Sequence, residues 1–261
     1  MEKLLDEIES YWSTRTEGYS EVNHKELAGT QKNAWLKVLT SQFPDKPKEE
    51  IRILDIGTGP GFFPVILAEA GYHVDAVDYT EGMLEKAKEN AGDLCRNIRF
   101  LRMDAQKLDF EDNTFDVVIS RNLTWNLEHP DVAYREWVRV LKVGGRLLNF
   151  DANWYGYLYE EEQRKAYEND RKNVENNSLD DHYLCTDIER MERIALQVPL
   201  SKISRPQWDV KTLREAGLLG IRTDTEIWKT VWSEEERLNY QSTPMFMVTG
   251  VKPDHFLNLP V

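Results

Sequence analysis

Three glycines stand at alternate positions in the stretch LDIGTGPGFFP, directly after an apolar run. They are Gly57, Gly59 and Gly61, and Asp55 stands two residues before the first of them. Because glycine costs conformational entropy, this spacing indicates a backbone that approaches a ligand closely or adopts positive φ angles. The plainer alternative is a tight turn between a strand and a helix that binds nothing.

Two phosphate-binding patterns fit this stretch poorly. A P-loop requires a lysine followed by serine or threonine, and the stretch has no such lysine. A dinucleotide fingerprint requires a third glycine where this chain has Phe62, whose bulk opposes close packing of helix on strand. The form present is D-x-G-x-G-x-G, with Asp78 at the end of the next predicted strand. A carboxylate there can accept hydrogen bonds from both hydroxyls of a ribose, and Thr80 is then expected to cap the following helix.

The segments that must position these residues alternate between strand and helix. Strands separated by helix-length crossovers predict a parallel sheet built from right-handed βαβ units. The fold expected is an α/β, Rossmann-like, doubly wound sheet of seven strands, mostly parallel with an antiparallel hairpin at its edge. Strands are predicted at 51–56, 72–78, 98–104, 114–121, 146–152, 219–229 and 245–251, and helices at 62–71, 80–92, 130–145 and 210–217. Two further helical runs are predicted before residue 43.

Composition limits the kinds of partner. The chain has 33 Lys and Arg against 46 Asp and Glu, a formal charge of −13, which argues against nucleic acid as a partner. Cys95 and Cys185 define neither a disulfide framework nor a metal site, and each is expected to be a small buried residue. The first residues do not resemble a signal peptide, and no apolar run reaches the length of a membrane span. A cytoplasmic protein is expected.

The motifs resemble those of the class I S-adenosylmethionine (SAM)-dependent methyltransferases, in the small-molecule branch that includes ubiquinone/menaquinone-type enzymes. The resemblance covers roughly residues 10–150 and rests on the glycine stretch, Asp78, YTEGMLEKA, MDAQKLDF and REWVRVLKVGGRLL, in which Val143 replaces the usual proline. It implies SAM as the cofactor, S-adenosylhomocysteine as the product, and a small-molecule methyl acceptor. It also implies four segments: a helical lid (1–50), a SAM-binding core (51–151), an inserted substrate cap (152–206) and a C-terminal part that completes the core (207–261).

The same resemblance assigns cofactor-binding roles. The backbone of Gly57, Thr58 and Gly59 would pass beneath the methionine part of SAM. Asp55 would help to hold the amino group of SAM through this loop. Asp104 and the N–H of Ala105 would bind the adenine edge, with Tyr79 and Met83 near its ring. Arg121 and Asn122 would lie under the methionine end. Tyr19, in YWSTRTEGYS, would donate its phenol to the SAM carboxylate.

Methyl transfer needs a general base only when the acceptor is protonated. The candidates near the expected mouth of the site are Glu128, His129, Asp151 and His182, and none of them is preferred. His182 with Cys185 offers too few ligands for a metal. Two alternatives stay open: a SAM-binding sensor or interaction protein without turnover, and a nicotinamide-dependent Rossmann oxidoreductase.

Overall fold

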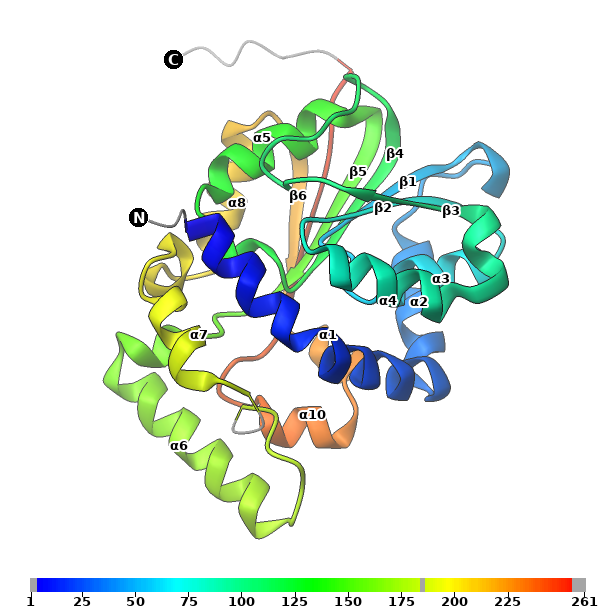
Figure 1. The fold of residues 1–261 in the computed structure, drawn as a ribbon. Helices are drawn as coiled ribbons and strands as arrows, with labels where there is room; N and C mark the ends of the chain where they lie inside the picture. The colour runs from blue at the N-terminus through cyan, green and yellow to red at the C-terminus, as the bar shows by residue number, and fades with distance from the viewer. Residues whose placement is uncertain (1–3, 184–185, 255–261) are drawn as a thin grey trace.

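The computed structural model describes residues 4–183 and 186–254, and a seven-stranded sheet forms its centre (Figure 1). The strands lie in the order β3-β2-β1-β4-β5-β7-β6. β1 to β5 are parallel, whereas β7 is antiparallel to both β5 and β6. The strands are β1 (Arg52–Ile56), β2 (His73–Asp78), β3 (Ile98–Arg102), β4 (Phe115–Arg121), β5 (Leu141–Asp151), β6 (Leu219–Asp224) and β7 (Phe246–Val251). The predicted fold class is confirmed.

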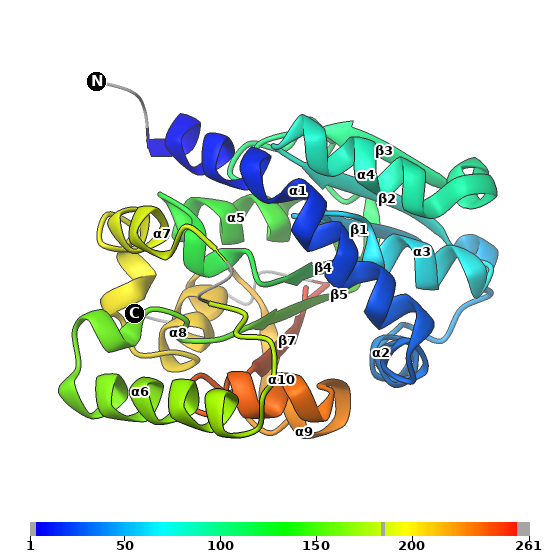
Figure 2. The same ribbon diagram turned by 60° about the horizontal axis from the view of Figure 1, so that its bottom comes forward.

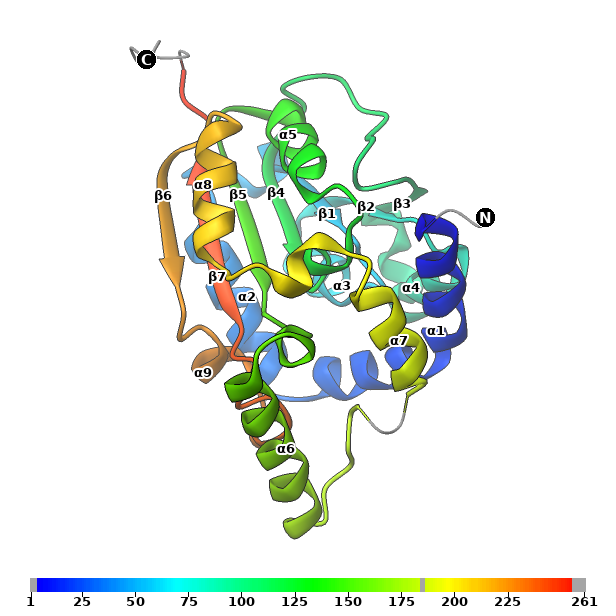
Figure 3. The same cartoon turned by 90° about the vertical axis from the view of Figure 1, so that its left-hand side faces the viewer.

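Helices cover both faces of this sheet (Figure 3). α2 and α3 pack on one face, and α5 and α8 pack on the other. The helices are α1 (Leu4–Ala28), α2 (Gln31–Ser41), α3 (Phe62–Glu69), α4 (Glu81–Ala91), α5 (Pro130–Val140), α6 (Glu161–Asn176), α7 (Ile188–Ala195), α8 (Gln207–Glu215), α9 (Trp228–Val231) and α10 (Glu234–Asn239). The short 3-10 turns are η1 (Lys48–Glu50), η2 (Gly92–Asn97), η3 (Thr124–Asn126), η4 (Gly156–Leu158) and η5 (Pro199–Lys202).

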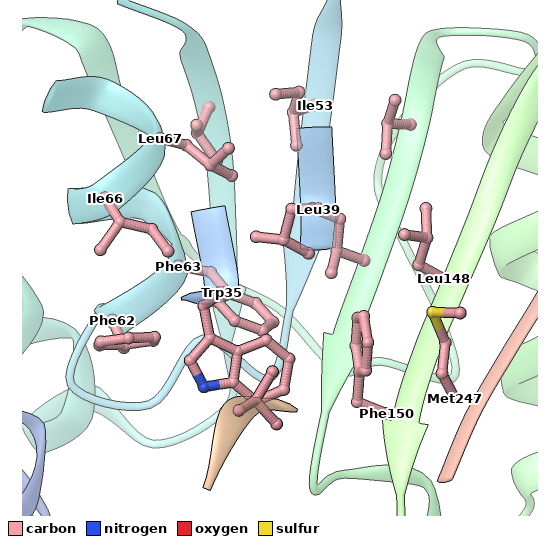
Figure 4. Packing of buried hydrophobic residues seen from close by; sticks show 14 of the residues in the cluster. Trp35, Leu39, Ile53, Phe62, Phe63, Ile66, Leu67, Leu148, Phe150 and Met247 are labelled. Carbon is pink, nitrogen blue, oxygen red and sulfur yellow. The ribbon is translucent and has the colours of Figure 1, made fainter. Parts of the chain in front are cut away.

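The central strands are apolar throughout because helices bury both of their faces. Alternate residues point to opposite sides: Ile53 joins the cluster beneath α2 and α3, and Leu54 joins the cluster beneath α5. Trp35 of α2 lies at the heart of the first cluster, where its ring meets those of Phe63 and Phe150 edge-on (Figure 4). The same cluster contains Ile53 of β1 and Val117 and Ile119 of β4, and both strands end at the site described below.

Two predicted boundaries are wrong. The helix predicted to reach Gly145 ends at Val140, because Leu141 is buried and pairs with Phe115 at the start of β5. The strand predicted to reach Lys229 ends at Asp224, and the return to β7 passes through α9 and α10 rather than a short turn.

Two helical runs were predicted before residue 43, and the structure has two helices there, of which the first, α1, is long. α1 extends from Leu4 to Ala28, and α2 starts only after Gly29 and Thr30. Figure 2 shows α1 crossing in front of the sheet, between α4 and α7. The boundaries of the four predicted segments stay predictions. Within the two described ranges, no helix is both long enough and apolar enough to cross a bilayer.

A buried arginine joins the region 152–206 to the sheet. The Arg205 side chain is fully buried, and its Nη1 donates to Asp151 Oδ2 over 2.7 Å at the end of β5. Its Nε and Nη2 donate to the two carboxylate oxygens of Asp209 on α8, over 2.9 and 2.6 Å. One guanidinium therefore connects two carboxylates that lie on separate elements.

Candidate active site

A cavity opens where β1 to β4 end, which is the edge at which such sheets bind ligands. Its volume, including the part open to solvent, is about 840 Å³. The loops after the four strands form one side of the cavity. The other side is contributed by α1 through Leu5, Ile8, Glu9, Trp12 and Tyr19.

The three glycines of the first loop have different tasks. All three adopt positive φ angles, of 71°, 53° and 90°. Gly57 and Gly59 line the cavity, and a Cβ on Gly57 would lie 2.7 Å from the Leu123 side chain. Gly61 instead faces α4, where a Cβ would lie 3.0 Å from that of Ala87. The third glycine therefore permits helix packing, and only the first two border the cavity.

The Asp78 carboxylate lines the cavity and also fixes the glycine loop. Its Oδ2 accepts a hydrogen bond from the N–H of Gly59, and its Oδ1 accepts one from the N–H of Thr80, both over 2.9 Å. Thr80 is the N-cap residue of α4, as predicted, although its side chain makes no capping hydrogen bond. Burial raises the pKa of Asp78, against the opposing effect of these N–H donors. A carboxylate has about four acceptor positions, so two backbone bonds leave capacity for a ligand.

Asp55, near the end of β1, and Thr58, in the glycine loop, are buried and do not line the cavity. Asp55 is 2% exposed, and burial raises its pKa from 3.8 to about 7. The role predicted for Asp55, which acts through the loop, therefore involves no direct contact between its carboxyl and a ligand in the cavity.

The loop after β3 contributes Asp104, Ala105 and Gln106 to the cavity. Asp104 Oδ1 accepts from the backbone N–H and the side-chain amide of Gln106, over 2.8 and 3.1 Å, which holds the carboxylate in place. The carbonyl of Ala105 accepts from the indole of Trp137 over 2.9 Å. Tyr79 and Met83 line the same part of the cavity.

Arg121, at the end of β4, is held in a buried ion pair. Its Nη1 and Nη2 donate to the two carboxylate oxygens of Glu26 on α1, over 2.8 and 3.0 Å. The guanidinium also lies about 5 Å from the ring centroids of Phe62 and Phe63. Burial acts to lower the pKa of Arg121, but Glu26 raises it above the ordinary value. This ion pair is internal, and it connects α1 to the cavity.

Tyr19 and Asn122 lie beside this pair and line the cavity. Burial raises the pKa of the Tyr19 phenol. Asn122 adopts a left-handed backbone, with φ of 56°, and its carbonyl accepts from the indole of Trp125 over 3.0 Å. With these two residues, ten of the twelve predicted cofactor-binding residues line one cavity.

Of the four candidate bases, only Glu128 lines the cavity. His129 is exposed, with its ring 3.8 Å from Glu128. Asp151 is fully buried against Arg205, and His182 contacts Tyr240 and Glu235 away from the cavity.

Several lining residues were not predicted, among them Leu5, Ile8, Glu9, Gln106 and Asn126, although Gln106 lies inside the MDAQKLDF stretch. Trp12, in the same YWSTRTEGYS stretch as Tyr19, also lines the cavity. Among the described residues of 152–206, none lines it, so the predicted cap does not border this space. Cys95 is half-buried with a free thiol, and Cys185 lies outside the described residues.

Comparison with known proteins identifies the domain that carries this cavity. Residues 54–149 match the family model described as "Methyltransferase domain". A demethylmenaquinone methyltransferase of Renibacterium salmoninarum is 31% identical over 148 residues, which cover 57% of this chain and 60% of that protein. The chain thus aligns with less than two thirds of the length of this relative.

Solved structures share the fold at lower identity. Phosphoethanolamine N-methyltransferase 2 of Haemonchus contortus, in complex with SAM, matches with a TM-score of 0.61 at 18% identity, over 85% of this chain and 53% of that one. The [4+2]-cyclase SpnF matches with a TM-score of 0.55 at 17% identity, over 84% and 81%. The fold alone therefore does not specify methyl transfer. Residues 54–149 of this chain therefore match a methyltransferase domain, and this part of the chain is similar to a demethylmenaquinone methyltransferase.

Proposed function

We propose that this protein transfers a methyl group from SAM to a small or medium-sized molecule. The supporting observation is that the glycine loop and the acids after β2 and β3 line one cavity inside a methyltransferase domain. Gly57 and Gly59 pass beneath the methionine part of SAM, and Asp78 accepts from the ribose hydroxyls. Asp104 and the N–H of Ala105 bind the adenine edge, whose amino group and ring nitrogen form the complementary donor and acceptor.

The remaining predicted residues complete this cofactor site. Tyr79 and Met83 border the adenine ring, and Arg121, Asn122 and Tyr19 border the methionine end. Their common position on the lining of one cavity supports this assignment.

The reaction is an in-line displacement at the methyl carbon. The sulfur–methyl bond breaks and its electron pair stays on sulfur, which yields S-adenosylhomocysteine, while a lone pair of the acceptor forms the new bond. Because the sulfonium is already a good leaving group, the protein mainly aligns the acceptor and excludes water. An acceptor that carries a proton must lose it to a base or to solvent. Glu128 is our candidate for that base because it lines the cavity.

Calorimetric titration with SAM, S-adenosylhomocysteine and NADH tests the cofactor. We expect the first two to bind and NADH not to bind. The Asp78→Ala variant should lose about 1.5–3 kcal/mol of SAM affinity, the range for a charged hydrogen bond. Asp75→Ala is the matched control, because Asp75 lies on the same strand and pairs with Arg99 over 2.7 Å outside the cavity. If the two variants bound SAM with equal affinity, the proposal that Asp78 binds the ribose would be refuted.

Two other functions make different predictions. A SAM-binding sensor would bind the cofactor and release no S-adenosylhomocysteine with any acceptor. A nicotinamide-dependent enzyme would bind NADH, but Phe62 is buried where such a site needs glycine. We also propose a cytoplasmic location.

A further inference from the structure

Gln106 connects the loop after β3 to the start of α5. It lies in the cavity lining and is half-buried. Its side-chain Oε1 accepts a hydrogen bond from the backbone N–H of His129, the N-cap residue of α5, over 2.6 Å. Its Nε2 donates to Asp104 Oδ1 over 3.1 Å. One amide group therefore bridges two loops and contacts the carboxylate proposed to bind adenine.

The N–H of His129 determines which end of this amide faces Asp104. A backbone N–H is a donor only, so it requires the oxygen of Gln106 and directs the amide nitrogen toward the carboxylate. A flipped amide would set two donors against each other at His129 and two acceptors against each other at Asp104. The protein itself therefore fixes the orientation of the amide, before any ligand binds.

The hydrogen bonds from Gln106 occupy only one oxygen of Asp104. Oδ1 accepts from both the backbone N–H and the Nε2 of Gln106, whereas Oδ2 accepts from no group in residues 4–183 and 186–254. The backbone beside this carboxylate is held as well, because the Ala105 carbonyl accepts from the Trp137 indole over 2.9 Å. Asp104 lines the cavity, so Oδ2 is available to a donor on a ligand.

We propose that Gln106 is a positioning residue that makes the cofactor site selective for a 6-aminopurine. It holds Asp104 so that Oδ2 accepts from the amino group, and its donors favour the carboxylate form, which accepts only. Without the side-chain donor the carboxyl is free to turn or to take up a proton, and a protonated carboxyl donates to a 6-oxo group. This inference rests on the proposed function, because it assumes that the adenine of SAM occupies this part of the cavity.

The test measures how strongly the protein prefers adenine over hypoxanthine. Calorimetric titration compares S-adenosylhomocysteine with S-inosylhomocysteine, in which an oxygen replaces the amino group and the neighbouring ring nitrogen carries a proton. Both changes oppose the groups proposed to bind adenine, since an oxygen then faces Asp104 and an N–H faces the N–H of Ala105. We expect the wild type to bind S-adenosylhomocysteine at least about a hundredfold more tightly, as a site built around a ligand's donor rejects an analogue that lacks it.

Two variants of Gln106 separate its donor from its shape. Gln106→Glu keeps an oxygen for the N–H of His129 but sets a second carboxyl against Asp104, and two adjacent carboxyls favour sharing a proton. Gln106→Leu removes the donor without adding charge. Each should lower the preference for adenine by about tenfold, the effect of one hydrogen bond, and the N–H of Ala105 should maintain the remainder. Gln241→Glu, at an exposed position, controls for the added charge and should keep the preference of the wild type.

The outcomes distinguish this inference from the proposed function. No binding of S-adenosylhomocysteine to the wild type would refute the proposed function itself. Binding of this ligand with an unchanged preference for adenine in both Gln106 variants would overturn only the positioning role. An equal loss of affinity for both ligands would also overturn it, because Gln106 would then support the loop without affecting which base is chosen. A lower preference in both variants, with Gln241→Glu unchanged, would support it.

Discussion

Asp55 should make the stability of the protein depend on pH through a single buried carboxyl. Burial beneath the glycine loop raises its pKa from 3.8 to about 7. Since one pKa unit corresponds to about 1.4 kcal/mol, the ionised side chain costs the folded state at most about 4 kcal/mol. The sign follows from the raised pKa: the contribution of Asp55 to stability is full below the unfolded pKa near 3.8 and is lost as the pH rises toward 7.

The assay compares urea unfolding of the wild type with that of Asp55→Asn, which cannot ionise. A range from pH 5.5 to pH 8 avoids the pI of about 5.0. Over this range the stability of the wild type relative to the variant should fall by about 2 kcal/mol. Because the wild type and the variant share all other titratable groups, the difference between them removes the contribution of those groups. Asp109→Asn, at an exposed position, is the matched control. A relative stability that stays constant with pH would refute the reasoning.

Three other substitutions test the packing around the site. Glu26→Gln leaves Arg121 without its bidentate carboxylate and should lower the free energy of unfolding by about 3–5 kcal/mol; a loss below 1 kcal/mol in urea would mean that the pair is solvated. Arg205→Met, which leaves two buried carboxylates without a counter-ion, should lower the free energy of unfolding by a similar amount in the same assay, and an unchanged stability would contradict the buried ion pair. Gly61→Ala should destabilise more than Gly71→Ala, because both have φ near 90° but only Gly61 faces a neighbouring helix; equal melting temperatures would exclude that contact.

Local spacing explains why much of the site was predictable. The loops after parallel strands meet at one edge of a sheet, so a correct order of strands brings Gly57, Asp78 and Asp104 together. The partner of Arg121 was not predictable in this way. Glu26 lies on a helix that precedes the sheet, and only tertiary packing brings the two charges together. The same holds for the hydrogen bond from the Trp12 indole to Asn126, which also joins α1 to a loop of the sheet.

The predicted cap shows the opposite limit. The region 152–206 was predicted as a substrate cap, and its Tyr155, Tyr157 and Tyr183 pack in a cluster with Tyr11 and Trp125. Aromatic composition alone does not distinguish a ligand-binding wall from a packed interior. The helix and strand boundaries near Gly145 were wrong for a related reason, since strand pairing overrode the helical pattern.

The arginine that joins two carboxylates at the base of region 152–206 limits how this chain can be recombined with its relatives. Asp151 lies before the region, Asp209 lies after it, and Arg205 lies at its end. Because Arg205 pairs with both carboxylates, the three residues depend on one another. A chimaera that imports the region from a protein without this arginine would place two like charges together without a counter-ion. Substitutions at these positions should therefore be strongly epistatic, and exchange of this region between such proteins should give a stable fold only when all three residues move together.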